Sequence, residues 1–226
     1  LLSRVPAMKP EEVDDLIVGC SFPEGETGMN LGRILAMGAG LPITTSGMTI
    51  NRFCSSGVQA IADATAKIRA GWSEVIIAGG CETMSHIPMG GGIFRPLPDW
   101  KFDGSMPNVY VSMGVTAENV AANYNISRED QDKFGVESNR RAYEAQQAGK
   151  FKEEIIPITA YKYKIKKGKR IRETFVLDYD DGVRWPTTLE DLAKLKSPFK
   201  AGGSVTAGNA SQMTDGAAFS LLMSME

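Results

Sequence analysis

Cysteine and histidine are scarce in this chain. Its 226 residues include three cysteines and one histidine: Cys20, Cys54, Cys81 and His86. A structural zinc site normally takes four Cys or His ligands, and these four are scattered with no CxxC pair, so we expect no metal. The odd number of cysteines also disfavours a disulfide framework. We therefore expect reduced thiols and a cytoplasmic location.

Long apolar runs and an excess of positive charge are lacking as well. No stretch approaches the roughly 18 apolar residues that span a bilayer, and 25 basic against 27 acidic residues give a net charge of −2. A general nucleic-acid-binding domain should be basic. We therefore expect neither membrane nor nucleic acid as a partner. The apolar fraction of 42% is ordinary for a globular protein, whereas 24 glycines predict many tight turns.

Nucleotide and calcium motifs are also absent. No GxxxxGK[ST] sequence occurs, and Gly38-Ala39-Gly40 is not followed by a helical pattern. The acids Asp178, Asp180 and Asp181 are out of register for a calcium loop, whose twelfth position would be Leu189 instead of Glu. These patterns therefore predict no metal or dinucleotide site.

The first third of the chain alternates between strand and helix patterns. Apolar, β-prone runs at residues 16–19, 48–50 and 74–79 predict strands, and segments 30–39 and 58–70 have helical spacing. Segment 58–70 is apolar around most of its circumference, which predicts a buried helix. The alternation predicts an α/β fold with a layered, mainly parallel sheet.

The rest of the chain predicts an inserted α-rich region and a return to the core. Helical patterns occupy residues 116–124, 127–148 and 188–195, and the last two begin with good capping residues. A final strand at 219–223 should rejoin the first sheet. We expect a core domain at residues 1–84, an inserted domain at 85–212, and a strand returning to the core at 213–226.

Cys54 is the sharpest chemical feature. It follows a β-prone run and precedes a helix, with Ser55, Ser56 and Gly57 beside it. Unpaired N–H groups at a helix N-terminus favour the thiolate, which is the nucleophilic form. The alternative is a small buried hydrophobic residue. His86 lies in a loop-like sequence and is interpreted as a surface or packing residue, not as the base.

A basic run lies at residues 161–172, with seven Lys or Arg and no acid. Such a run is usually a solvated hairpin, which we favour. The alternative is attraction of a polyanionic ligand such as a nucleotide with several phosphates.

Four motifs resemble the thiolase family. They are NRFCSSGVQAI at 51–61, GGCETMS at 79–85, MGVTAENVA at 113–121, and TAGNAS at 206–211 followed by DGAA at 215–218. The motifs occur in the family order along nearly the whole chain. The NRFCSSG sequence is more similar to degradative 3-ketoacyl-CoA thiolases than to the biosynthetic type.

The resemblance implies an acyltransferase and its site. Cys54 would accept the acyl group when a 3-ketoacyl-CoA is cleaved by CoA, or in the reverse condensation. CoA contacts would fall on Met113, Phe199, Ala207 and Ser211. CoA and acyl-CoA would be substrates, with no tightly bound cofactor. The fold would be a thiolase-like layered core with a mixed sheet, a buried nucleophile helix and an inserted CoA-binding loop domain. Family analogy also implies a homodimer or homotetramer.

The sequence departs from the family in one respect. Thiolases continue into a second, similar core domain that carries an Asn-Glu-Ala-Phe motif, a Gly-His-Pro histidine and a second catalytic cysteine within a Cys-x-Gly motif. None of these occurs here, so we expect an incomplete thiolase that is inactive by itself, its other half lying in cis or in a second chain. The alternatives are a catalytically silent CoA-binding or assembly module and, less favoured, a condensing enzyme related to ketoacyl synthases.

Overall fold

The computed structural model describes residues 1–93, 109–166 and 168–225. The chain divides into two compact units, which are described separately. The first comprises Leu1–Leu97 and Met213–Glu226, and the second Pro98–Gln212. No helix in the described part of the chain combines the length and the apolar character that a membrane crossing requires.

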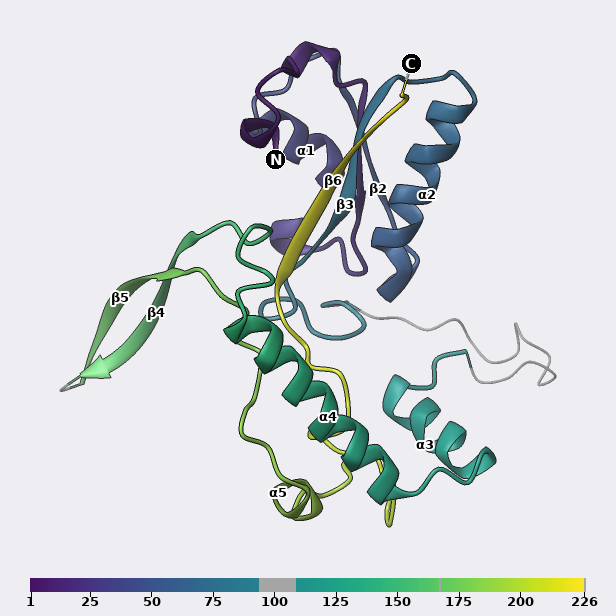
Figure 1. The fold of residues 1–226 in the computed structure, drawn as a ribbon, viewed down its shortest axis with the longest axis vertical. Helices are drawn as coiled ribbons and strands as arrows, with labels where there is room; N and C mark the ends of the chain where they lie inside the picture. Colours follow the sequence, from purple (N-terminus) through teal and green to yellow (C-terminus); the bar gives the residue numbers. More distant parts are fainter. Residues whose placement is uncertain (94–108, 167, 226) are drawn as a thin grey trace. The chain divides into compact units, whose positions relative to one another are not determined.

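The first unit is built on a four-stranded mixed sheet. In spatial order its strands are β2 (Ser46–Ile50), β1 (Asp15–Gly19), β3 (Val75–Glu82) and β6 (Gly216–Met223) (Figure 1). Strand β1 pairs in parallel with β2 and β3, and β6 runs antiparallel to β3. This arrangement confirms the predicted α/β class and the return of the last strand to the core.

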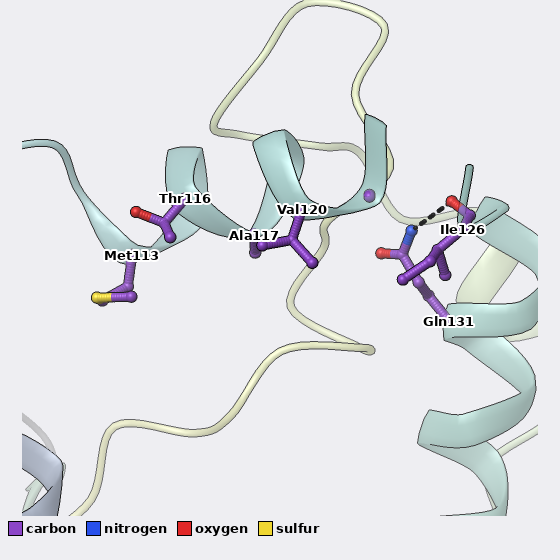
Figure 2. A pocket seen from close by; sticks show the side chains of 7 residues that line it. Met113, Thr116, Ala117, Val120, Ile126 and Gln131 are labelled. Atoms are coloured by element: carbon purple, nitrogen blue, oxygen red, sulfur yellow. Dashed lines mark hydrogen bonds between the residues drawn. The ribbon is translucent and has the colours of Figure 1, made fainter. Parts of the chain in front are cut away.

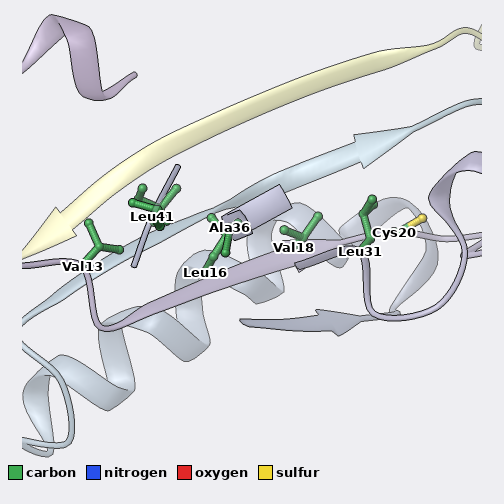
Figure 3. Close-up of a cluster of buried hydrophobic side chains, with 8 residues drawn as sticks. Val13, Leu16, Val18, Cys20, Leu31, Ala36 and Leu41 are labelled. Atoms are coloured by element: carbon green, nitrogen blue, oxygen red, sulfur yellow. The ribbon is translucent and has the colours of Figure 1, made fainter. Parts of the chain in front are cut away.

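Two helices cover opposite faces of this sheet (Figure 1). Alternate side chains of a strand point to opposite faces. Leu16 and Val18 of β1 belong to the same apolar cluster as α1 (Leu31–Gly38), part of which Figure 3 shows. Ile17 lies between them in sequence and packs instead with α2 (Ser56–Arg69). Because β1 packs against α1 on one face and α2 on the other, its five residues are all buried.

The prediction that helix 58–70 is buried around most of its circumference is wrong for the described chain. Of the residues of α2, only Ser56, Ala60 and Ala64 are buried, and Val58 is 72% exposed. Ala60 and Ala64 form the buried part of the face that lies on the sheet, with half-buried Ile68 packed beside them, whereas Val58 and Ile61 are exposed. The sequence pattern showed that the helix is apolar, but it did not show which of its faces packs on the sheet.

The second unit contains three helices and a hairpin among its described residues. The helices are α3 (Met113–Asn123), α4 (Arg128–Gln147) and α5 (Leu189–Ala193), and the hairpin joins β4 (Ile158–Lys166) to β5 (Lys169–Leu177). The hydroxyls of Ser127 and Thr188 accept hydrogen bonds from the N–H groups of Asp130 and Asp191. These bonds confirm the predicted N-terminal caps.

Candidate functional site

Cys54 lies in a short connection between β2 and α2. Phe53–Ser55 form a single 3₁₀ turn, and α2 begins at Ser56. Strand β2 is parallel to β1, so this turn follows the carboxyl end of a parallel strand. The side chain of Cys54 is exposed. Cys54 thus lies two residues before the first residue of α2, at the end of the helix whose N–H groups can donate to a developing oxyanion.

Side-chain hydrogen bonds fix the shape of this turn. The N–H of Phe53 donates to Asn51 Oδ1 at 2.9 Å. Ser56 Oγ accepts from the N–H of Arg52 at 2.8 Å and donates to the carbonyl of Phe53 at 2.6 Å. The residues on both sides of Cys54 are therefore held by local polar groups.

A close backbone approach places the start of α2 against β1. A Cβ atom added to Gly19 would lie 2.5 Å from the carbonyl carbon of Ser56. Only glycine permits this approach, because any larger residue would push the helix start away from the strand. Gly19 therefore helps to position the turn that carries Cys54.

The three thiols differ in environment. Cys20 is 1% exposed, and burial raises the pKa of its thiol. Cys81 is half-buried, and burial again raises the pKa of its thiol, with the carboxylates of Glu82 and Asp215 adding to the effect. Cys54 is the most accessible thiol of the three.

His86 does not behave as a partner of the thiol. Its Nδ1 lies 3.0 Å from the carboxylate of Glu26, and both side chains are exposed. This supports the interpretation of His86 as a surface residue. Across residues 1–93, 109–166 and 168–225, no three His, Cys, Asp or Glu side chains gather as around a metal ion.

In the second unit, two of the expected CoA-contacting residues are neighbours. Met113 is the first residue of α3 and is 66% exposed. A Cβ atom on Gly114 would lie 2.2 Å from the ring of Phe199, so this ring packs directly on the helix start. Phe199 remains 42% exposed. Together they present apolar surface at the N-terminus of α3.

An open apolar pocket of about 380 Å³ runs along α3 from Met113. It is lined by Met113, Thr116, Ala117, Val120, Ala121, Ile126 and Gln131. Figure 2 shows the labelled side chains and the hydrogen bond from Gln131 Nε2 to the carbonyl of Ile126, which is 3.3 Å long. Most of its lining is apolar.

Ala207 and Ser211 lie in an exposed loop whose preceding residues are firmly anchored. Val205 and Thr206 are buried. The N–H of Thr206 donates to Asn209 Oδ1 at 2.7 Å, and Asn209 Nδ2 donates to Asp132 Oδ1 at 2.9 Å. The TAGNAS sequence is therefore tied to α4 through Asn209.

Glu118 is a structural residue that the sequence analysis missed. It is 4% exposed, and its carboxylate accepts hydrogen bonds from the N–H groups of Ser204 and Val205 and from the hydroxyl of Ser197. The Ser204 N–H and these neighbouring donors lower the pKa of Glu118 to about 2, against an opposing effect of burial. The sequence did contain one signal for a buried acid. Val115 and Ala121 lie three residues before and after Glu118, so helical spacing places Glu118 on the same face of α3 as these apolar residues.

Comparisons with known proteins show which family the chain resembles. A family model described as the N-terminal domain of thiolase matches residues 1–226. The 3-ketoacyl-CoA thiolase of Bacillus subtilis (strain 168) is 46% identical, covering 95% of this chain and 54% of the relative. The peroxisomal 3-ketoacyl-CoA thiolase 5 of Arabidopsis thaliana is 43% identical, covering 96% and 47%.

A solved structure shows the same fold. The crystal structure of the Bacillus anthracis acetyl-CoA acetyltransferase is 37% identical, with a TM-score of 0.79 over 99% of this chain and 57% of that one. The chain thus spans about half the length of the relatives it matches. On the match along its full length and on these identities, the chain belongs to the thiolase family, in which it corresponds to the N-terminal domain.

Proposed function

We propose that this chain supplies the nucleophile and CoA-binding surface of a 3-ketoacyl-CoA thiolase. The observation that carries the proposal is an exposed Cys54, held in a hydrogen-bonded turn at the N-terminus of α2, in a chain of the thiolase family. Relatives at 43–46% identity are named 3-ketoacyl-CoA thiolases, which favours the cleavage of 3-ketoacyl-CoA by CoA.

The chemistry divides into two acyl transfers. The Cys54 thiolate attacks the 3-keto carbon, the bond between C2 and C3 breaks, and acetyl-CoA leaves as a carbanion that takes up a proton. The shortened acyl group remains on Cys54 as a thioester. The thiol of a second CoA loses its proton and attacks this thioester, which releases acyl-CoA and restores the thiolate. N–H groups at the start of α2 are suited to stabilising the oxyanion in both transfers.

The CoA surface is assigned to the inserted segment. Phe199 and Met113 offer apolar surface for the pantetheine arm, and the anchored loop presents Ala207 and Ser211 to it. CoA acts as a substrate, without a tightly bound cofactor. The division into residues 1–84, 85–212 and 213–226 stays a prediction, with CoA binding in the middle segment.

The remaining catalytic groups, the assembly and the compartment are also proposals. A Gly-His-Pro histidine and a Cys-x-Gly cysteine would come from a C-terminal thiolase half, in cis or as a second chain, because neither motif occurs in these 226 residues. We further propose a homodimer or homotetramer. A cytoplasmic location stays a prediction, and one relative is named peroxisomal.

Thiolysis assays test this proposal. We expect no turnover of acetoacetyl-CoA by the 226-residue chain alone, since removing one member of a group that acts together costs nearly as much as removing all. Joining the chain to the C-terminal part of the Bacillus subtilis 3-ketoacyl-CoA thiolase should restore turnover. Robust turnover by the 226-residue chain alone would contradict the proposal.

A second candidate is a catalytically silent CoA-binding or assembly module. Such a module would need only the fold and the CoA-binding surface of the N-terminal thiolase domain that the chain matches. The silent module would bind CoA in a calorimeter, yet the joined protein would not cleave acetoacetyl-CoA. The two proposals therefore predict opposite results in the same assay.

A further inference from the structure

Phe53, the residue before Cys54, has an unusual backbone conformation. Its φ is +48°, in the left-handed region that bulky residues rarely adopt. Asparagine or glycine would occupy this position at lower cost. A phenylalanine held there suggests a role for its side chain, because strained residues of this kind cluster at functional sites.

The surrounding structure compensates for this conformation. Besides accepting from the N–H of Phe53, Asn51 donates from Nδ2 to the carbonyl of Ser21 at 2.8 Å. The carboxylate of Glu82 in turn accepts from the N–H groups of Ser21 and Phe22, at 2.7 Å and 3.2 Å. The loop after β1 and the turn after β2 are thus joined at the carboxyl ends of two parallel strands.

This connection brings two aromatic rings together beside Cys54. The ring centroids of Phe22 and Phe53 are 6.1 Å apart, with planes at 50°. Phe53 is nevertheless 63% exposed, so its ring contributes little to the buried core. The pair is therefore an exposed apolar surface, held by the hydrogen bonds of Asn51 and Glu82, next to the residue that carries the exposed thiol.

We propose that the Phe22–Phe53 pair is an apolar surface that contacts the acyl chain attached to Cys54. This inference depends on the proposed function, in which Cys54 carries an acyl group. The pair favours unbranched aliphatic chains of several carbons and disfavours acyl groups with a charge close to the thioester. Phe53 thereby becomes a specificity-determining residue, and its left-handed backbone goes with a ring that is 63% exposed instead of buried in the core.

The experiment measures the reaction of Cys54 with methyl, butyl and hexyl methanethiosulfonates. In each case the thiolate attacks the sulfenyl sulfur, an S–S bond forms and methanesulfinate leaves, so no thiolase activity is needed. Rate constants for the folded 226-residue chain, assigned to Cys54 by mass spectrometry, are divided by those for N-acetylcysteine. We expect this ratio to rise about twofold per methylene, half of the roughly fourfold that complete burial would give.

Variants distinguish contact between the aromatic pair and the acyl chain from a merely structural role of these residues. Phe53→Asn keeps a residue that tolerates the left-handed backbone, and we expect it to remove the dependence on chain length while leaving the methyl rate within about twofold. Phe22→Ala, which leaves the strained position intact, should weaken the dependence. Phe134→Asn, a change at a 77% exposed phenylalanine of the other unit, should have no effect.

Three results would overturn the inference. The first is a rate ratio that does not change with chain length in the parent. The second is a dependence on chain length that stays the same in both Phe53→Asn and Phe22→Ala. The third is an equal loss of reaction rate for all three reagents, which would mean that Phe53 only positions Cys54. A thermal melt of each variant identifies misfolding, and Phe22→Ala decides the outcome if Phe53→Asn does not fold. An unreactive Cys54 would contradict the proposed function as well, whereas a flat slope at a reactive Cys54 would leave that function standing.

Discussion

At the scale of single residues, the chain separates one reactive thiol from two protected ones. Cys20 lies in the core cluster beside α1 and its thiol donates to Glu82 Oε1 at 3.5 Å. Cys81 lies on β3, where neighbouring carboxylates oppose a second negative charge. Thiolate fraction and access both decide alkylation, and both are unfavourable at these two positions.

We therefore expect iodoacetamide to modify Cys54 at least about tenfold faster than Cys20 or Cys81 in the folded chain. Peptide mapping by mass spectrometry at several reaction times measures the three rates. The same chain in urea should lose the contrast, which provides the control. Equal rates for all three thiols in the native chain would contradict the assignment of Cys54.

Glu118 predicts a pH dependence at the same scale. Its pKa is about 2 in the folded chain and near the usual value of about 4.3 when unfolded. Between these values the unfolded chain binds more protons, so stability rises with pH. The contribution is complete above about pH 4.5 and is lost as the pH falls to about 2.

Glu118→Gln should accordingly cost about 1–3 kcal/mol of unfolding free energy at pH 7. The difference between parent and variant should shrink towards zero near pH 2. Urea denaturation at pH 7, 4 and 2 measures it. Glu129→Gln, which removes a surface pair with Lys133, is the control and should cost less than about 0.5 kcal/mol. A difference that stays constant with pH would show that the carboxylate charge is not what anchors the loop.

At the scale of elements, the ring of Phe199 packs directly on the start of α3. Because a methyl group on Gly114 would overlap this ring, Gly114→Ala should displace it. We expect the Kd for CoA, measured by calorimetry, to rise about three- to tenfold, equivalent to roughly 0.7–1.4 kcal/mol. Gly38→Ala, where a methyl group meets open space, is the matched control. An unchanged Kd for Gly114→Ala would remove Phe199 from the CoA surface.

The basic run forms the exposed hairpin of β4 and β5, as we favoured. Several of its charges are engaged within the hairpin: Lys162 and Lys164 pair with Glu173, and Arg170 and Arg172 lie over Tyr163 and Tyr161. The carboxylate of Glu173 thus offsets part of the positive charge of the hairpin.

Screening acts over about 8 Å at physiological salt, so we expect replacement of Lys166, Lys167 and Lys169 by glutamine to change the Kd for CoA less than about twofold under that condition. Calorimetry at low and high salt checks this. A larger rise that disappears at high salt would instead assign the hairpin to binding the phosphates of CoA.

At the scale of the whole molecule, local signals predicted most elements. Helix α4 has a capping serine at Ser127 and a glycine at 149 with φ +69°, and its predicted limits agree to within a residue or two. Strand β1 is buried throughout and β3 over its residues 76–79, which agrees with the apolar runs from which these strands were predicted. The thiolase motifs identified the family, which the comparisons confirm.

What the sequence could not predict depends on contacts between distant residues. Glu118 meets Ser204 and Val205 more than 80 positions along the chain. Phe53 adopts a conformation that its own identity disfavours, and only Asn51 and Ser56 explain it. The exposed outer face of α2 likewise reflects which residues have neighbours, which local periodicity does not encode.

The central claim for the whole molecule is that Cys54 carries the acyl group. It is tested by mixing acetoacetyl-CoA with the chain joined to the C-terminal part of the Bacillus subtilis thiolase, quenching in acid, and mapping acetylated peptides by mass spectrometry. We predict a single acetyl group, on Cys54, which added CoA removes before the quench and which is absent from the Cys54→Ala variant along with thiolysis. Acetylation at Cys20 or Cys81 in place of Cys54, or thiolysis by Cys54→Ala within about tenfold of the parent rate, would contradict the account.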